Sequence, residues 1–128
     1  MNPIVLDMYH GDVVNSWEAI WDAGIRGIIH KVSQGVNFRD KKYQMRRQPI
    51  LDQGFLLGFY HFGTGDDVDQ QVDNFLGAVG DTSNVLLALD FEPNPNGKTM
   101  SLQQAVTWLQ KVYERTGQRP VVYSGHLI

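Results

Sequence analysis

Two carboxylates close the apolar run VLLALDFEP (residues 85–93), where Asp90 and Glu92 stand two positions apart. If this run is a strand, its alternate residues share a face, so both acids lie on one face about 6 to 7 Å apart. Two carboxyl groups at that spacing do not ionise independently, and one of them acquires the raised pKa that a general acid needs near neutral pH. An isolated pair of this kind also suits a helix cap or an exposed loop, so its place in the fold decides its role.

Other apolar runs also end in polar or aromatic residues. Asp7 ends the first run, and the remaining residues of this kind are Tyr9, His10, His30, Lys31, Ser33, Gln34, Tyr60, His61, Phe62, Tyr123 and Ser124. Carboxylates with aromatic rings at one mouth are typical of carbohydrate cleavage. One acid protonates the glycosidic oxygen, a second stabilises or attacks the sugar carbon, and flat rings stack on sugar faces.

Other chemistries have weaker support in the sequence. His10, His30 and His61 could join the acids in a metal site, but no H-x-H or H-E-x-x-H motif is present, so structural histidines are the favoured interpretation. Ser124 lacks a G-x-S-x-G elbow, and FGTGDD lacks a P-loop lysine, which favours a plain turn. We therefore predict no metal and no cofactor.

The elements that position these residues alternate along the chain. Strands are predicted at residues 3–9, 25–33, 55–63, 85–93 and 120–125, and helices at residues 15–24, 40–54, 66–80 and 101–117. This alternation indicates an α/β fold with a parallel sheet, either doubly wound and open or wrapping toward a (β/α) barrel. In both cases the functional residues gather at the carboxyl ends of the strands.

Caps and breaks delimit the predicted helices. The expected N-caps are Asn15 or Ser16, Asp66 or Asp67, and Ser101, and the expected stops include Gly24, Gly54 and Gly80. Pro49 predicts a break near Gln48. The expected buried faces are Val68, Val72, Phe75 and Val79 in the third helix, and Leu102, Ala105, Leu109 and Val112 in the fourth.

Composition indicates one folded domain, residues 1–128. Apolar residues make up 42% of the chain and charged residues 20%, and the net charge is −3 with scattered basic residues. These values give no reason to expect a nucleic-acid partner or insertion into a membrane. Cysteine is absent, which excludes disulfides and a cysteine nucleophile. The first residues, MNPIVLDMYH, do not have the pattern of a signal peptide.

Six motifs in order resemble glycoside hydrolase family 25, the lysozymes (N-acetylmuramidases) that cleave peptidoglycan. They run from the first strand to the last: VLDMYHGDV, IIHKVSQGVNFRD, GFYHFG, QQVDNFL, LALDFEP and TGQRPVVYSG. The resemblance implies a parallel-stranded (β/α) barrel-like fold. It also implies a 1,4-β-N-acetylmuramidase that acts at the cell wall, outside the cell or after phage-type lysis.

Roles for individual residues follow from the same resemblance. Glu92 would be the catalytic acid, Asp90 the second catalytic carboxylate, and Asp7 the residue that tunes the pair and holds the sugar. The second carboxylate would either position the substrate's N-acetyl group or act as nucleophile. The implied substrate-binding residues are Tyr9, Lys31, Gln34, Tyr60, His61, Phe62 and Tyr123.

The sequence departs from the family pattern in two respects. Gln34 stands where the family usually has Glu, which removes a charge near the mouth. The family fold continues beyond five βα units with three further strands and another acidic residue, whereas this sequence ends after the fifth strand, so we expect an incomplete barrel with open sheet edges. Self-association would cover those edges. The alternative function is a catalytically weak or inactive module that binds glycan or self-assembles.

Overall fold

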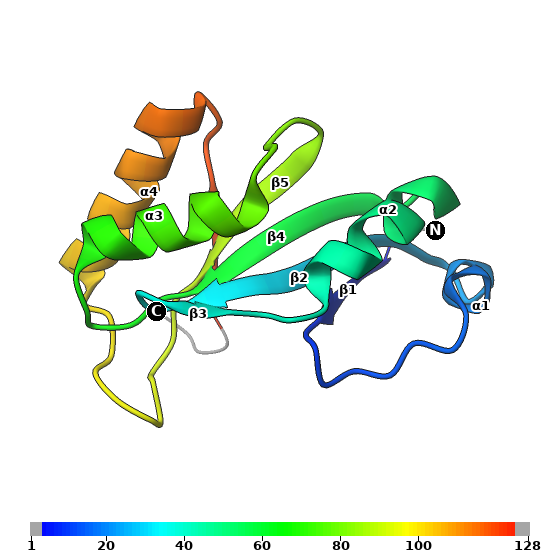
Figure 1. Ribbon diagram of the computed structural model, residues 1–128, viewed down its shortest axis with the longest axis horizontal. Helices are drawn as coiled ribbons and strands as arrows, with labels where there is room; N and C mark the ends of the chain where they lie inside the picture. The colour runs from blue at the N-terminus through cyan, green and yellow to red at the C-terminus, as the bar shows by residue number, and fades with distance from the viewer. Residues whose placement is uncertain (1–3, 125–128) are drawn as a thin grey trace.

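The computed structural model describes residues 4–124, so Pro3 and Gly125, which end two predicted strands, lie outside the described residues. Its elements are β1 (Ile4–Met8), α1 (Trp17–Asp22), β2 (Ile25–Gln34), β3 (Phe38–Arg39), α2 (Tyr43–Gln53), β4 (Leu56–Phe62), α3 (Val68–Val79), β5 (Val85–Asp90), α4 (Leu102–Thr116) and β6 (Val121–Tyr123). The predicted alternation of strands and helices is confirmed (Figure 1).

The main strands form one parallel sheet in the order β1-β2-β4-β5-β6. Each crossover leads to the adjacent strand on the same side, which is the progression of a barrel rather than of a doubly wound sheet. The short strand β3 pairs antiparallel with the end of β2. Sequence periodicity does not predict β3, because two residues are too few to show alternation.

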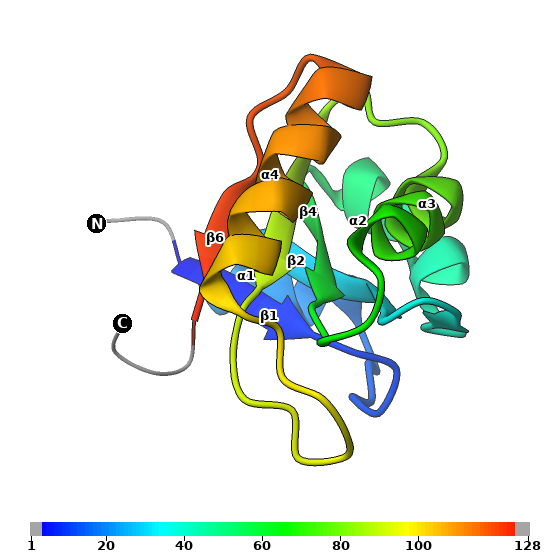
Figure 2. The same cartoon turned by 90° about the vertical axis from the view of Figure 1, so that its left-hand side faces the viewer.

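The sheet curls until its two end strands face each other. A cavity of about 260 Å³ is lined by Val5 and Asp7 from β1 and by Val121 and Tyr123 from β6, together with residues of the strands between them. Helices α2, α3 and α4 lie on the outer side of the curl (Figure 2). The described residues therefore form a half-barrel that is open along one side.

The hydrophobic core lies between the outer face of the sheet and the helices. Ile28, Phe59 and Leu87 alternate with inward-facing residues along their strands and are fully or almost fully buried. Burying such side chains contributes about 1.5 to 3 kcal/mol each. On the helix side, Phe75 of α3 and Trp108 of α4 pack in the same cluster. Helix packing thus fixes the outer face, and the polar site residues of the inner face lie toward the carboxyl ends of the strands.

The predicted helix faces are only partly correct. Val72, Phe75 and Val79 are buried as expected in α3, and Val68 packs against the core. In α4 the buried set is Ala105, Trp108 and Val112, whereas Leu102 is 63% exposed. Leu102 opens the helix, beyond the part that packs on the sheet. Trp108 lies three residues after Ala105 and four residues before Val112, so the three side chains share one face of the helix.

Local signals set the ends of the helices. Ser16 accepts a hydrogen bond from the Ala19 amide at the start of α1, and Ser101 forms a capping box with Gln104 at the start of α4. Asp67 occupies the N-cap position of α3 without a side-chain capping bond. Gly54 ends α2 with φ 98°, a conformation that glycine adopts without strain. These ends agree with the prediction.

The predicted break at Pro49 is wrong, because α2 runs unbroken from Tyr43 to Gln53. Pro49 and Gln48 lie on the exposed face of the helix. The hydrogen bond that proline cannot donate would reach the carbonyl of Met45, whose side chain is also exposed. Water on that face can satisfy the carbonyl, so the helix accommodates the proline without ending.

Candidate active site

One rung of the sheet brings four predicted site residues into line. Register pairs Gln34 with Phe62, Phe62 with Asp90, and Asp90 with Tyr123, across β2, β4, β5 and β6. The rung lies at the carboxyl ends of the strands, where the sequence predicted the site. Glu92 follows two residues after Asp90 and is partly exposed.

The second acid position lies on β1. Asp7 pairs with Ile29 and lines the inner cavity together with Tyr60 and Tyr123. The Tyr60 hydroxyl donates a hydrogen bond to the Asp7 carboxyl. Partial burial raises the pKa of Asp7 although this bond opposes the shift, and the charges of Asp12 and Glu92 raise the pKa further. Asp7 and the pair on β5 therefore belong to one electrostatic site.

Asp90 holds its proton much more tightly than an ordinary aspartic acid. Burial, followed by the neighbouring Glu92 and then Asp7, raises the pKa of Asp90 to about 8, while Lys31 acts in the opposite direction. Its Oδ1 atom is buried and has no hydrogen-bond partner among residues 4–124. The predicted raised pKa is present, and it falls on Asp90, whereas the resemblance assigned the acid role to Glu92. Because the two carboxyls interact strongly, they are best treated as a pair that shares a proton.

A bulge in β2 sets a cation opposite the acids. Lys31 pairs with Tyr60 and Gln34 pairs with Phe62, so four residues of β2 lie opposite three of β4. This extra residue puts Lys31 and Gln34 on the same inner face, where the Lys31 ammonium donates to Gln34 Oε1 at 2.6 Å. The ammonium also lies 5.4 Å from the centre of the Phe62 ring. Burial lowers the pKa of Lys31, and the charges of Asp40, Asp90 and Glu92 oppose that change.

The aromatic residues differ in how much surface they offer. Tyr9 is 46% exposed and Tyr123 is 50% exposed, so each presents a free ring face or edge. Phe62 is buried, and Tyr60 is partly buried within the cavity. Tyr60 is therefore placed to hold Asp7, and the two exposed tyrosines are placed to meet a ligand from solvent.

His61 does not lie at the mouth, contrary to the prediction that it binds substrate. It is fully buried on the outer side of the sheet, stacked on Trp108 with ring centres 5.6 Å apart. Its Nδ1 lies 2.7 Å from Ser33 Oγ and its Nε2 lies 3.0 Å from Gln71 Oε1. Gln71 Oε1 also accepts from the Thr64 amide, so His61 Nε2 is the donor to Gln71, and Ser33 donates to Nδ1. Burial lowers the pKa of His61 to about 4.

His10 and His30 do not form a metal site with the acids. His10 contacts Asp40, and His30 is buried with its Nε2 beside Arg46. Among residues 4–124, no three histidine or carboxylate side chains gather in a way that could hold a metal ion.

The loop after Glu92 is tied to the loop after β4. Thr99 forms an antiparallel bridge with Thr64, and the Gly65 amide donates to the Lys98 carbonyl at 2.9 Å. Gly65 is needed here because a Cβ atom would lie only 2.6 Å from Lys98 Cβ. This anchoring fixes the chain after Glu92, and the pairing of β5 with β4 and β6 fixes the chain before it.

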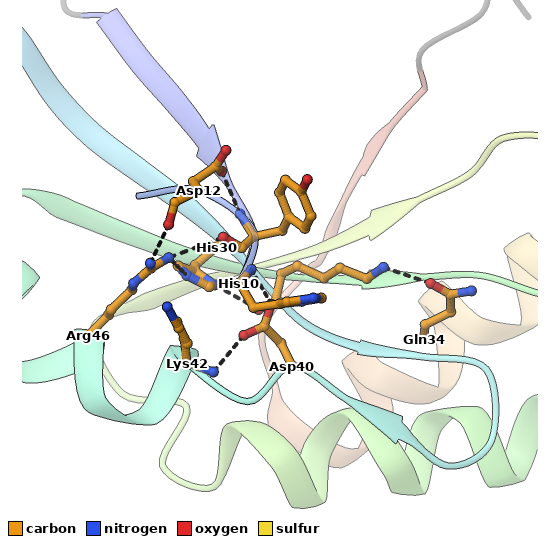
Figure 3. A network of polar contacts seen from close by, with 9 residues as sticks. His10, Asp12, His30, Gln34, Asp40, Lys42 and Arg46 are labelled. Atoms are coloured by element: carbon orange, nitrogen blue, oxygen red, sulfur yellow. Dashed lines mark hydrogen bonds and ion pairs between the residues drawn. The ribbon is translucent and has the colours of Figure 1, made fainter. Parts of the chain in front are cut away.

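Sequence reasoning missed two buried charged residues beside the mouth. Asp40 and Arg46 are almost fully buried, and both contact the turn that carries Tyr9 (Figure 3). Asp40 ends one of the six motifs, but its type and spacing do not distinguish it from a helix cap. Arg46 belongs to a short basic stretch that resembles an ordinary solvated surface.

The family model for "Glycosyl hydrolases family 25" matches residues 6–127. The chain belongs to this family. The predicted resemblance and the barrel-like fold class are thereby confirmed. Lysozyme M1 of Streptomyces globisporus is 25% identical over 119 residues, covering 86% of this chain and 40% of that protein.

Solved structures of family 25 members superimpose on the half-barrel. The bacterial lysozyme from Streptomyces coelicolor gives a TM-score of 0.81 at 26% identity, covering 93% of this chain and 61% of that chain. A family GH25 lysozyme from Aspergillus fumigatus gives 0.79 at 26% identity, with 93% and 63% covered. The chain spans between 27% and 51% of the length of the curated relatives it matches. None of the helices within residues 4–124 has the length and apolar character to cross a membrane.

Proposed function

We propose that this chain carries the catalytic acids of a peptidoglycan hydrolase of the lysozyme type. The reaction is cleavage of the β-1,4 bond between N-acetylmuramic acid and N-acetylglucosamine. The observation that carries the proposal is the Asp90–Glu92 pair at the end of β5, with Asp7 across the curl, in a family 25 chain. Matched relatives named Lysozyme M1 and N,O-diacetylmuramidase, the latter from Arthroderma benhamiae, support the same substrate class.

The acid pair supplies the proton. With the pKa of Asp90 at about 8, the pair retains one proton at neutral pH. Glu92 is the more accessible member, so it passes that proton to the glycosidic oxygen as the bond breaks. While Glu92 holds the shared proton, Asp90 is the ionised member of the pair, and its negative charge stabilises the developing oxocarbenium ion beside it. In this proposal Asp90 either orients the N-acetyl group or attacks the sugar carbon.

The substrate lies across the mouth of the half-barrel. Tyr9 and Tyr123 offer exposed rings for stacking on sugar faces. Lys31 and Gln34 offer hydrogen-bond donors from the inner face of β2. Tyr60 acts through Asp7, and Phe62 forms the apolar floor beneath Lys31. The site of action is the cell wall.

Replacing the proposed proton donor tests this function. Glu92→Gln keeps the size of the side chain and removes the acid, so the release of new reducing ends from purified cell walls should fall at least about 100-fold. Glu114→Gln is the matched control, since Glu114 is exposed on α4 away from the mouth. Circular dichroism of both variants should equal that of the wild-type chain.

The same assay separates hydrolysis from binding alone. The chain spans about three fifths of the solved relatives, which motivates a second candidate, a module that binds glycan strands without cleaving them. Sedimentation of the chain with cell walls and no new reducing ends would favour that module. Cleavage that persists in Glu92→Gln would remove Glu92 from the role of acid.

A further inference from the structure

A tight turn links the acid on β1 to the exposed ring of Tyr9. The Asp12 amide donates to the Tyr9 carbonyl at 3.1 Å, and the Tyr9 amide donates to Asp12 Oδ2 at 2.9 Å. The turn begins only two residues after Asp7, at the carboxyl end of β1. Its conformation therefore determines where the Tyr9 ring lies relative to Asp7.

Arg46 holds this turn through two of its main-chain carbonyls. It reaches from α2, and its Nη1 donates to the Tyr9 carbonyl at 3.1 Å while its Nη2 donates to the Asp12 carbonyl at 2.6 Å (Figure 3). The same Nη1 lies 3.1 Å from His30 Nε2. His30 Nδ1 lies 2.8 Å from the Lys31 carbonyl, so Nδ1 carries the hydrogen and Nε2 accepts from Arg46. The guanidinium thus joins both ends of the turn to β2.

Asp40 holds the middle of the same turn. Its Oδ2 accepts from the His10 amide at 2.7 Å and lies 3.3 Å from His10 Nδ1. Its Oδ1 accepts from the Lys42 amide at 2.8 Å, which ties the turn to the start of α2. Asp40 and Arg46 together hold the turn at every residue except Gly11.

Burying these two charged side chains costs folding free energy. Asp40 is 2% exposed and Arg46 is 7% exposed, and among the described residues they form no direct ion pair with each other. Charged groups in such positions carry a large desolvation penalty, and apolar residues of similar volume often serve stability equally well. Apolar residues in these two places could not hold the turn, because they offer no hydrogen bonds to its main-chain amides and carbonyls.

We propose that Asp40 and Arg46 are positioning residues that fix the turn of residues 9–12 at the carboxyl end of β1, so that the exposed Tyr9 ring is held where a sugar can contact it. The inference rests on the proposed function, because Tyr9 is its substrate contact. Neither residue touches the substrate. Both act through the main chain of the turn, and a loosened turn weakens binding more than it slows the chemical step.

Arg46→Lys tests the proposal, with Arg47→Lys as its matched control. Arg47 follows Arg46 on α2 and also donates to two carbonyls, those of Val79 and Asp81, at a distance from the mouth. With soluble peptidoglycan fragments, Arg46→Lys should raise KM about tenfold and leave kcat within about threefold. Arg47→Lys should change neither. Equal effects of the two variants on KM would overturn the proposal.

A double-mutant cycle with Tyr9→Ala separates positioning from general destabilisation. Tyr9→Ala keeps the carbonyl that Arg46 contacts and removes only the ring. If Arg46 acts by placing that ring, Arg46→Lys adds little to the KM of Tyr9→Ala. Full additivity of the two changes would refute the role.

A third measurement distinguishes a failure of the positioning role from a failure of the proposed function. A wild-type chain that neither binds nor cleaves peptidoglycan removes the proposed function and, with it, the role of Tyr9. The hold of Asp40 and Arg46 on the turn is measured separately, by amide hydrogen exchange at His10 and Asp12. Exchange there should be at least about tenfold faster in Arg46→Lys and unchanged in Arg47→Lys. Unchanged exchange in both variants would show that Arg46 does not hold the turn.

Discussion

Asp90 illustrates how a single residue combines strand geometry with acid chemistry. Its side chain points inward because it continues the inner series of Leu86 and Ala88 along β5. Glu92, two residues further on, approaches it from the same face, as alternation predicts. The spacing of the acids could therefore be read from the sequence. Which member of the pair has the raised pKa could not, because that depends on burial by neighbouring strands.

The raised pKa of Asp90 predicts how stability changes with pH. Its carboxyl has a pKa of about 8 in the fold and an ordinary value near 3.8 in the unfolded chain. Between these values the unfolded state loses its proton first, so this group makes the fold less stable as pH rises from about 4 to 8. Asp90→Asn removes the effect. It should raise the free energy of unfolding by roughly 1 to 3 kcal/mol at pH 8 relative to its effect at pH 4.

Urea unfolding of the wild-type chain and of Asp90→Asn at several pH values checks this difference. Asp52→Asn serves as the control, since Asp52 lies on α2 outside the mouth. A difference between wild type and Asp90→Asn that does not grow with pH would contradict the raised pKa.

His61 shows the limit of prediction from residue type alone. Tyr60, His61 and Phe62 end the same strand, which suggests a shared place at the mouth. The alternation that correctly places Asp90 and Glu92 on one face puts His61 on the opposite face from its two neighbours. Lys31 and Gln34 show the converse, since alternation separates residues three apart and only the bulge in β2 brings them together. No feature of the sequence marks that bulge.

At the scale of elements, a buried chain of hydrogen bonds connects β2, β4 and α3. Ser33 donates to His61, His61 donates to Gln71, and Gln71 Nε2 donates to the carbonyls of Thr64 and Asp66. This series of hydrogen bonds lies behind the mouth, next to the bulge that places Lys31. It therefore holds the sheet and the start of α3 in one arrangement, and it requires a neutral imidazole.

The neutral state of His61 predicts a loss of stability in acid. Folded His61 takes up a proton only near pH 4, whereas the unfolded side chain does so near 6.5. The unfolded state binds more protons between these values, so stability falls as pH drops from about 6.5 to 4. The expected loss from His61 is roughly 2 to 3 kcal/mol. His30 acts in the same direction, because burial lowers its pKa as well.

His61→Phe isolates the contribution of this one residue. Phenylalanine keeps an aromatic ring against Trp108 and cannot titrate. The variant is expected to be about 1 to 3 kcal/mol less stable at pH 7, because Ser33 and Gln71 lose their partner. Its stability should nevertheless fall less steeply than that of the wild type between pH 6.5 and 4, as measured by thermal unfolding. An equal slope in both proteins would mean that His61 titrates normally in the fold.

At the scale of the whole molecule, the inner face of the half-barrel is apolar and open. Val5, Leu86 and Val121 point inward and are 56%, 43% and 42% exposed. A second cavity, of about 530 Å³, lies near the amino ends of the strands and is lined mainly by such side chains. The edges of β1 and β6 have no strand partner on their outer sides among residues 4–124. Apolar surface next to open edges favours association.

We therefore expect the 128-residue chain to associate with a second copy as its concentration rises. Sedimentation velocity should show a growing fraction of dimer or larger species above about 10 μM. Replacing both Leu86 and Val121 with lysine should reduce that fraction, because charges on the inner face oppose its burial. Lys41→Glu and Lys42→Glu, on the outer side, provide the control for a change of charge. A monomer at every concentration would argue against this expectation.

The sequential order of the strands also bears on how the chain acquires its structure. Each strand pairs with the one that precedes it in the sheet, and paired residues are separated by only about 20 to 35 positions along the chain. During synthesis each new strand can dock on an edge that has already formed, without waiting for a distant segment. Among residues 4–124, β1 has no strand partner on its other edge. A ribosome-bound chain that ends after α3 should therefore already protect the amides of β2 against exchange, ahead of the arrival of Asp90 and Glu92.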